Sequence, residues 1–452
     1  MRLTRRKSIL TLIGTVLIIL GFRSHRSRTQ KEFSNSPQKN ELSEALDILS
    51  VPEIDTERMY QNFLKAAAGG FQDNPALLYQ GIQTSPYKAQ INDYPSRLQP
   101  KPDEENLVND SDDDKFSSYP IVGQLPKIED DSLQFLHEDI KEACICIGRF
   151  SSGEFKAKWL GRNALSNQEF WSATKFIPVL NLVSSLNTSI PDIDVDSCVI
   201  SGVDQQGNQR RLPLYNLVRD VVSYEEKIAT SNSLADMFKR FSSQLELENW
   251  LQSMTGNKHL IFRGDYGEEP FINEPKVIQR ITEKAIAIAD SEPIHPDWTD
   301  NTMSAYDLTR AISMLGWHNY IPPESRLPGV KWKNLESIIR AMGTDPARFT
   351  DLAIKELGLQ NTLDSVVILS KIGNGVTILR KRTEAVYVAL VQFVVRSPEK
   401  LGQAKFVTLS MALKAARAKV PRDLNREVVE LDARMATEVT QILQKALMSE
   451  LV

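Results

Sequence analysis

The sequence contains few of the residues that build disulfide, zinc or nucleotide sites. Its 452 residues include 3 cysteines, which are too few and too irregularly spaced for a disulfide framework or a paired C-x-x-C zinc ribbon. Its 5 histidines show no H-E-x-x-H spacing, and neither G-x-x-x-x-G-K-[ST] nor G-x-G-x-x-G occurs. We therefore expect no metal or organic cofactor, and zinc-protease, P-loop and Rossmann interpretations lack support.

A strong excess of one charge is also missing. The net charge is −4, so the surface is not built to neutralise phosphates and no nucleic-acid partner is expected. With 41% hydrophobic residues the chain is long and apolar enough to bury a sizeable core.

The charge is nevertheless unevenly distributed, because residues 1–31 carry eight lysines and arginines and no acid. These basic residues flank an uncharged apolar run over 8–22, which is shorter than the roughly 20 residues of a comfortable membrane span. The segment that follows continues with arginines instead of a small-residue cleavage site. We interpret residues 1–30 as an uncleaved signal-anchor, which predicts a protein bound to a membrane.

The next stretch, 31–125, differs in composition from the rest of the chain. Nine prolines lie between Pro37 and Pro126, and seven of the twelve residues 103–114 are acidic. Such a stretch favours a largely disordered tether, with a helical patch possible within 41–68.

Core-forming sequence runs from 126 to the end of the chain. Alternating apolar residues predict a hairpin over 143–159, and strands are expected over 365–370 and 384–395. Helical spacing predicts helices in seven ranges, namely 172–186, 214–222, 233–241, 246–254, 276–289, 304–315 and 425–451. This order indicates an α+β domain whose antiparallel sheet collects strands from both ends of the domain and is flanked by helices, with an all-helical lobe inserted between them.

One short motif carries candidate chemistry. Ser172 and Lys175 stand three residues apart at the head of an apolar helix, so they share one face. A desolvated lysine amine can accept the proton of a serine hydroxyl, and the N-terminus of a helix offers N–H groups to a developing oxyanion. The same S-x-x-K spacing occurs at Ser36, Ser85 and Ser397, each followed directly by proline. Taken alone, the motif favours a helix N-cap serine with an exposed lysine over a catalytic pair.

Further elements follow in a specific order. Thr230-Ser-Asn232 comes after the apolar helix, Glu269-Pro-Phe-Ile-Asn273 comes next, and Lys371-Ile-Gly373 ends an apolar strand. With Ser172-x-x-Lys175, this set resembles that of the class A β-lactamases, a family of penicillin-recognising serine hydrolases. The resemblance covers about 143–395 and implies the β-lactamase-like fold.

The resemblance implies a role for each residue. Ser172 would be the acyl-accepting nucleophile, Lys175 its base, Thr230 a proton relay to the leaving group, and Glu269 the residue that activates the hydrolytic water. The substrate-binding residues would be Asn232, Asn273, Lys371, Gly373 and Asn374. The backbone N–H groups of Ser172 and Asn374 would form the oxyanion hole, and Lys371 would attract a substrate carboxylate.

Two departures from the family pattern bear on the substrate. Thr230 adds a methyl group to the expected serine, and Ile372 removes the hydroxyl that the family uses to hold the substrate carboxylate. We therefore expect weaker anchoring of that carboxylate and a modified substrate.

The sequence predicts a membrane-tethered serine hydrolase that acts through an acyl-enzyme on a β-lactam or a peptidoglycan-type amide. Its catalytic domain would lie outside the cytoplasm, in the periplasm of a bacterial-type cell. Two alternatives remain open: a D-Ala-D-Ala carboxypeptidase-like amidase, and a catalytically degenerate binding domain of the same fold.

Overall fold

The computed structural model describes residues 54–68, 82–100, 115–151, 153–289, 301–377, 380–396 and 404–451. The signal-anchor expected over 1–30 lies outside these residues. Within the described ranges, no helix combines the length and the apolar character needed to cross a membrane.

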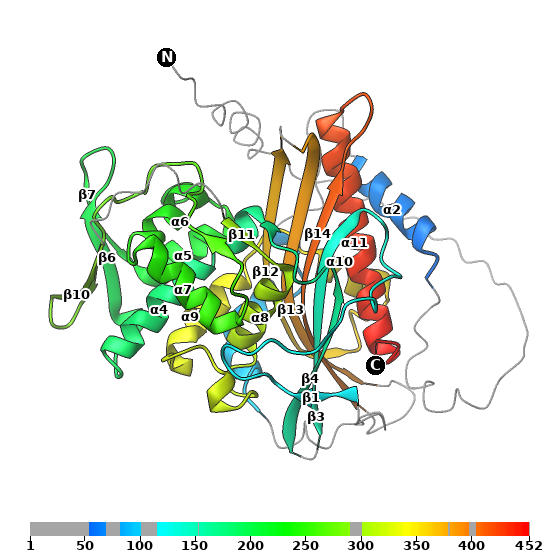
Figure 1. Ribbon diagram of the computed structural model, residues 1–452, viewed down its shortest axis with the longest axis horizontal. Helices are drawn as coiled ribbons and strands as arrows, with labels where there is room; N and C mark the ends of the chain where they lie inside the picture. The colour runs from blue at the N-terminus through cyan, green and yellow to red at the C-terminus, as the bar shows by residue number, and fades with distance from the viewer. Residues whose placement is uncertain are drawn as a thin grey trace, which may run out of the picture.

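The centre of the molecule is a seven-stranded sheet with five long or medium strands (Figure 1). These strands are β3 (Ile140–Ser151), β4 (Glu154–Arg162), β12 (Leu363–Thr377), β13 (Arg382–Arg396) and β14 (Ala404–Arg417). The order is β1-β4-β3-β14-β13-β12; β1 (Ser117–Ser118) is the short outer strand, and β2 (Ile128–Glu129) pairs with β4. The long strands pair antiparallel, so the first and last parts of the domain share one sheet. This confirms the α+β class and the origin of the strands.

A lobe of helices covers one face of the sheet (Figure 1). It comprises α4 (Ile177–Ser189), α5 (Leu214–Ser223), α6 (Ser231–Lys239), α7 (Gln244–Thr255), α8 (Ala305–Gly316) and α9 (Trp332–Met342). The lobe is not purely helical, because β6 (Cys198–Val203), β7 (Gln209–Pro213), β9 (Lys276–Gln279) and β10 (Lys284–Ile288) form a small sheet at its outer end. Three two- or three-residue strands, β5 (Gln168–Glu169), β8 (Ile261–Phe262) and β11 (Asn301–Met303), form a third sheet.

The helix predicted over 276–289 is wrong, because this segment is the β9–β10 hairpin. Its apolar residues fit helical spacing, but Val277 is buried by pairing of β9 with the distant strand β6. Ile281, which a helix would have placed on its apolar face, lies in the turn and is 84% exposed. Pairing with a strand far away in sequence therefore overrode the local pattern.

Alternation along the long strands creates two cores. Cys144, Cys146 and Leu369 point towards the helical lobe, whereas Ile145 and Ile368 point to the opposite face. The second face is covered by α11 (Leu424–Leu447) and α10 (Phe349–Glu356). The buried position of Cys144 and Cys146 on one strand face agrees with the pattern of the sequence.

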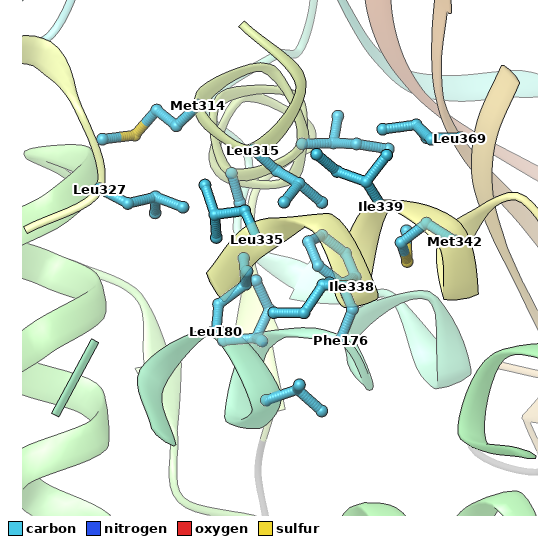
Figure 2. Packing of buried hydrophobic residues seen from close by; sticks show 14 of the residues in the cluster. Phe176, Leu180, Met314, Leu315, Leu327, Leu335, Ile338, Ile339, Met342 and Leu369 are labelled. Atoms are coloured by element: carbon cyan, nitrogen blue, oxygen red, sulfur yellow. The ribbon is translucent and has the colours of Figure 1, made fainter. Parts of the chain in front are cut away.

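The first core anchors the segment that carries the candidate nucleophile. Phe176 and Leu180 begin α4 directly after Lys175, and both are fully buried. In Figure 2 they lie beneath α9, whose Leu335 and Ile338 separate them from Leu315 of α8. Close packing of this kind fixes the backbone that precedes it in the chain.

The stretch expected to be a disordered tether is ordered where the structure describes it. Helix α2 (Thr56–Ala68) packs against α11 and buries Met59 and Phe63. The short helices η3 (Lys88–Asp93) and α3 (Tyr94–Arg97) lie against the domain, where the Arg97 guanidinium donates to the Val366 carbonyl at 3.0 Å. Apolar residues spaced through a polar stretch supplied enough buried area to order it, so the disorder expected over 31–125 does not hold for these parts.

Candidate active site

Ser172 lies on a tight turn that ends against the sheet. The turn is the 3₁₀ helix η6 (Trp171–Thr174), and the Lys175 N–H donates to the Ser172 carbonyl at 3.2 Å. The long helix predicted from Ser172 instead begins at Ile177, because Pro178 fits the first turn of a helix. Trp171 has a positive φ of 53°, a conformation that costs a non-glycine residue about 1–3 kcal/mol and is common where backbone strain serves a site.

Lys175 is buried beside this turn, with 1% of its surface exposed. Its Nζ donates to Ser231 Oγ at 3.1 Å and to Asn232 Oδ1 at 2.5 Å, and both acceptors are neutral. Burial lowers the pKa of Lys175 well below its usual range, and the nearby Lys371 charge lowers it further, while Asp236, Glu268 and Glu226 oppose the change. This shift favours the neutral amine, which is the form that can accept a proton.

The start of α6 brings Thr230 and Asn232 to the same place. Thr230 caps this helix, with its Oγ1 accepting from the Ser233 N–H at 3.2 Å. The Thr230 hydroxyl donates to the Glu268 carboxylate, and Asn232 Nδ2 donates to Glu268 Oε1 at 3.0 Å. Asn232 thus links the Glu268 carboxylate to Lys175 through two hydrogen bonds.

The carboxylate at this position belongs to Glu268, the neighbour of the residue that the sequence indicated. Glu269 is exposed, and its carbonyl accepts from Ser233 Oγ at 2.8 Å. Asn273 is exposed as well, with its carbonyl accepting from Arg240 Nε at 3.2 Å. The structure therefore does not bring Glu269 and Asn273 to Lys175, and it offers Glu268 instead.

Strand β12 presses against the nucleophile turn at Gly373. A Cβ atom at this position would lie 2.7 Å from the Ala173 nitrogen, 2.8 Å from the Phe170 carbonyl oxygen and 3.1 Å from the Ser172 nitrogen. Glycine is required for this approach, since a side chain would push the strand away. Asn374, the next residue, is exposed. The close approach places the backbone at 373–374 beside the Ser172 N–H, which is the arrangement that the expected oxyanion hole needs.

Lys371 lies two residues before Gly373 on β12 and is fully buried. Its Nζ donates to the Tyr224 hydroxyl at 2.6 Å and to the Ile372 carbonyl at 3.1 Å. Burial lowers the pKa of Lys371 to about 7, although the charge of Asp345 opposes the change. A substrate carboxylate would meet Tyr224 before it reached this amine.

Four residues of the site were missed by sequence reasoning: Ser231, Tyr224, Glu268 and Asp345. Ser231 stood inside the motif between Thr230 and Asn232, and Glu268 stood next to Glu269. Asp345 accepts from the Ala347 N–H at 2.9 Å, and burial raises its pKa to about 6. Tyr224 and Asp345 lie outside every motif, so only the fold could reveal them.

The site is built from hydroxyl, amine, amide and carboxylate groups. Across the residues that the structure describes, no group of three histidine, cysteine or acidic side chains is placed to hold a metal ion. Lys175 follows Ser172 by three residues, and its amine contacts Ser231 and Asn232, with the Glu268 carboxylate beyond Asn232. Hydroxyl, amine and carboxylate groups are the kinds of group that can form and hydrolyse a serine ester.

No family model and no curated protein matches the chain. Among solved structures, the chain is similar to a β-lactamase from Desulfarculus baarsii, at 15% identity and a TM-score of 0.37, covering 68% of this chain and 92% of that one. It is also similar to a peptidoglycan synthetase from Bifidobacterium adolescentis, at 10% identity and a TM-score of 0.32, covering 70% of this chain and spanning 58% of that one. These likenesses leave the reaction to be argued from the side chains.

Proposed function

We propose that the protein is a serine hydrolase related to the class A β-lactamases, and that it cleaves an amide of the β-lactam or peptidoglycan type through an acyl-enzyme on Ser172. One observation carries the proposal: a buried lysine with a strongly lowered pKa follows Ser172 on a strained turn that abuts Gly373. A purely structural lysine gains nothing from such a position, because burying an amine without a charged partner is unfavourable.

The reaction follows from these contacts. Neutral Lys175 takes the Ser172 proton while Oγ attacks the substrate carbonyl, and the N–H groups of Ser172 and Asn374 bind the oxyanion. The carbon–nitrogen bond then breaks and leaves an ester on Ser172. Glu268 holds the water that hydrolyses this ester, since its carboxylate is connected through Asn232 to Lys175.

The direct test is intact-mass spectrometry of the full-length protein after incubation with a fluorescent penicillin and, separately, with a fluorophosphonate. We expect both probes to add to the wild type and to fail with Ser172→Ala. Ser85→Ala is the matched control, because Ser85 has the same S-x-x-K spacing outside the site and its Oγ accepts from the Tyr87 N–H. A folded wild type that forms no adduct with either probe would refute the proposal.

The fate of the penicillin adduct separates two activities. Rapid turnover would favour β-lactamase activity, whereas a lasting adduct would favour the carboxypeptidase-like amidase. Both activities require Ser172, while a degenerate binding domain would tolerate Ser172→Ala without loss of function.

We further propose that residues 1–30 anchor the protein in a membrane and hold the hydrolase domain on the extracytoplasmic side, where peptidoglycan-type substrates occur. The basic flanks of the apolar run at 8–22 support this proposal. Recovery of the uncleaved full-length chain in the soluble cell fraction would contradict it.

A further inference from the structure

Acylation of Ser172 by an amide requires a group that delivers a proton to the departing nitrogen, while the Ser172 proton passes to Lys175. The departing nitrogen must be protonated, because an amide anion is a very poor leaving group. The resemblance gave this task to Thr230, but a hydroxyl group has a single hydrogen. The Thr230 hydrogen is directed at the Glu268 carboxylate, and Thr230 Oγ1 accepts the capping N–H of Ser233. A second hydroxyl group near the site could deliver the proton without disturbing these two contacts.

Tyr224 lies where such a donor would act. It follows the last residue of α5 in a left-handed conformation, with φ of 53°, which turns its ring into the site. The ring centroid is 3.8 Å from Lys371 Nζ and 5.5 Å from Lys175 Nζ, so the ring is close to both amines. The Ser172 side chain is close enough to the phenol to lower its pKa slightly against the larger effect of burial.

The hydrogen bonds of the phenol suit proton transfer. Its oxygen accepts from Lys371 Nζ at 2.6 Å, and its own hydrogen is donated to the Ile372 carbonyl at 3.1 Å. Lys371 Nζ also donates to that carbonyl at 3.1 Å. The carbonyl therefore keeps a donor when the phenol hydrogen turns towards a bound substrate.

We propose that Tyr224 is a further catalytic residue, the acid that protonates the leaving nitrogen and is reprotonated by Lys371. This inference rests on the proposed function. As the carbon–nitrogen bond breaks, the nitrogen takes the proton of the Tyr224 hydroxyl, and the Lys371 ammonium gives a proton to the phenolate. The Ser172 proton resides on Lys175 during this step. When the ester is hydrolysed, Lys175 returns its proton to Ser172, and the proton released by the attacking water, taken up by Glu268, restores Lys371.

Burial raises the pKa of the Tyr224 phenol, so this group is protonated at neutral pH and serves as an acid. Burial lowers the pKa of Lys371, so its ammonium group gives a proton to the phenolate readily. A raised pKa at Tyr224 and a lowered pKa at Lys371 both favour proton transfer from Lys371 to the Tyr224 phenolate during acylation.

The test uses two probes that differ in the leaving group. A penicillin loses a nitrogen that must be protonated, whereas a fluorophosphonate loses fluoride, which needs no proton. We expect Tyr224→Phe to slow the acylation of Ser172 by penicillin about 100-fold or more, the usual contribution of a general acid, and to change the fluorophosphonate rate less than about threefold. The full-length protein and single-turnover mass spectrometry give both rates.

Tyr266→Phe is the matched control. The Tyr266 ring also lies 5.5 Å from Lys175 Nζ, but its hydroxyl pairs with Thr174 Oγ1 at 2.9 Å. We expect this variant to react with both probes at the wild-type rate. An unchanged penicillin rate in Tyr224→Phe, or an equal loss with both probes, would overturn the role of Tyr224 as an acid. A wild type that reacts with neither probe would instead refute the proposed function.

Discussion

Two buried lysines, Lys175 and Lys414, lie near the turn that carries Ser172, and their surroundings differ. Lys175 donates to a hydroxyl and an amide oxygen, both uncharged. Lys414 of β14 lies 3.6 Å from a Glu384 carboxylate oxygen and 4.0 Å from one of Glu142. Burial lowers the pKa of both lysines. At Lys414 the next largest effect is the opposing charge of the adjacent Glu384. At Lys175 the next largest effect is the charge of Lys371, which adds to burial and is larger than the opposing effect of any single carboxylate.

The difference separates a reactive amine from a structural one. The hydrogen-bond partners of Lys175 are uncharged, so they stabilise its ammonium form less than a carboxylate would. This favours the neutral amine, the form that can act as a base. The carboxylates around Lys414 favour its charged form, and the cluster is connected to the turn because Glu384 also accepts from Trp171 Nε1 at 2.9 Å. Lys371, with Asp345 nearby and the Tyr224 hydroxyl as its acceptor, falls between these cases.

The largest effect is expected from Lys175→Met. Methionine fills a similar volume but cannot accept a proton, so the rate of Ser172 acylation by a fluorophosphonate should fall about 1,000-fold. The midpoint of urea denaturation should stay the same or rise. Burial lowers the pKa of Lys175 below its unfolded value, so the residue destabilises the fold until the pH approaches that unfolded pKa. A variant that fails to fold would contradict this assignment.

Lys414→Met should show the reverse pattern. It leaves the buried Glu142 and Glu384 carboxylates without their shared cation, although Glu384 keeps Arg380 at 3.0 Å and Arg382 at 2.6 Å. Breaking a buried ion pair costs about 3 kcal/mol, or roughly 150-fold in the unfolding equilibrium. The variant should unfold at lower urea yet, while folded, acylate at nearly the wild-type rate. Unchanged stability would show that this cluster is not structural.

The sequence was informative where function depends on neighbouring residues. The spacing of Ser172 and Lys175, the Thr230–Asn232 motif and the hairpin at 143–159 could each be recognised locally. The structure then placed Asn232 against Lys175 and Gly373 against Ser172. These contacts follow from the order of the motifs along one fold.

The rest depended on contacts that are distant in sequence. Strand β14 was missed, since 404–417 is rich in alanine, leucine and lysine and becomes a strand through pairing with β13 and β3. Tyr224 reaches the site because α5 ends there in a left-handed residue. Glu268 and Glu269 are adjacent in a loop, and the spacing of a sequence motif cannot tell which of two adjacent residues faces the site.

The pH dependence of Ser172 acylation by a fluorophosphonate tests the central claim most directly, because fluoride departs without help from Tyr224. If buried Lys175 is the base, the rate will reach its plateau well below pH 10.5 and will fall about tenfold per pH unit only below the lowered pKa of Lys175. A rate that continues to climb towards pH 10.5, the ordinary pKa of a lysine, would contradict the account.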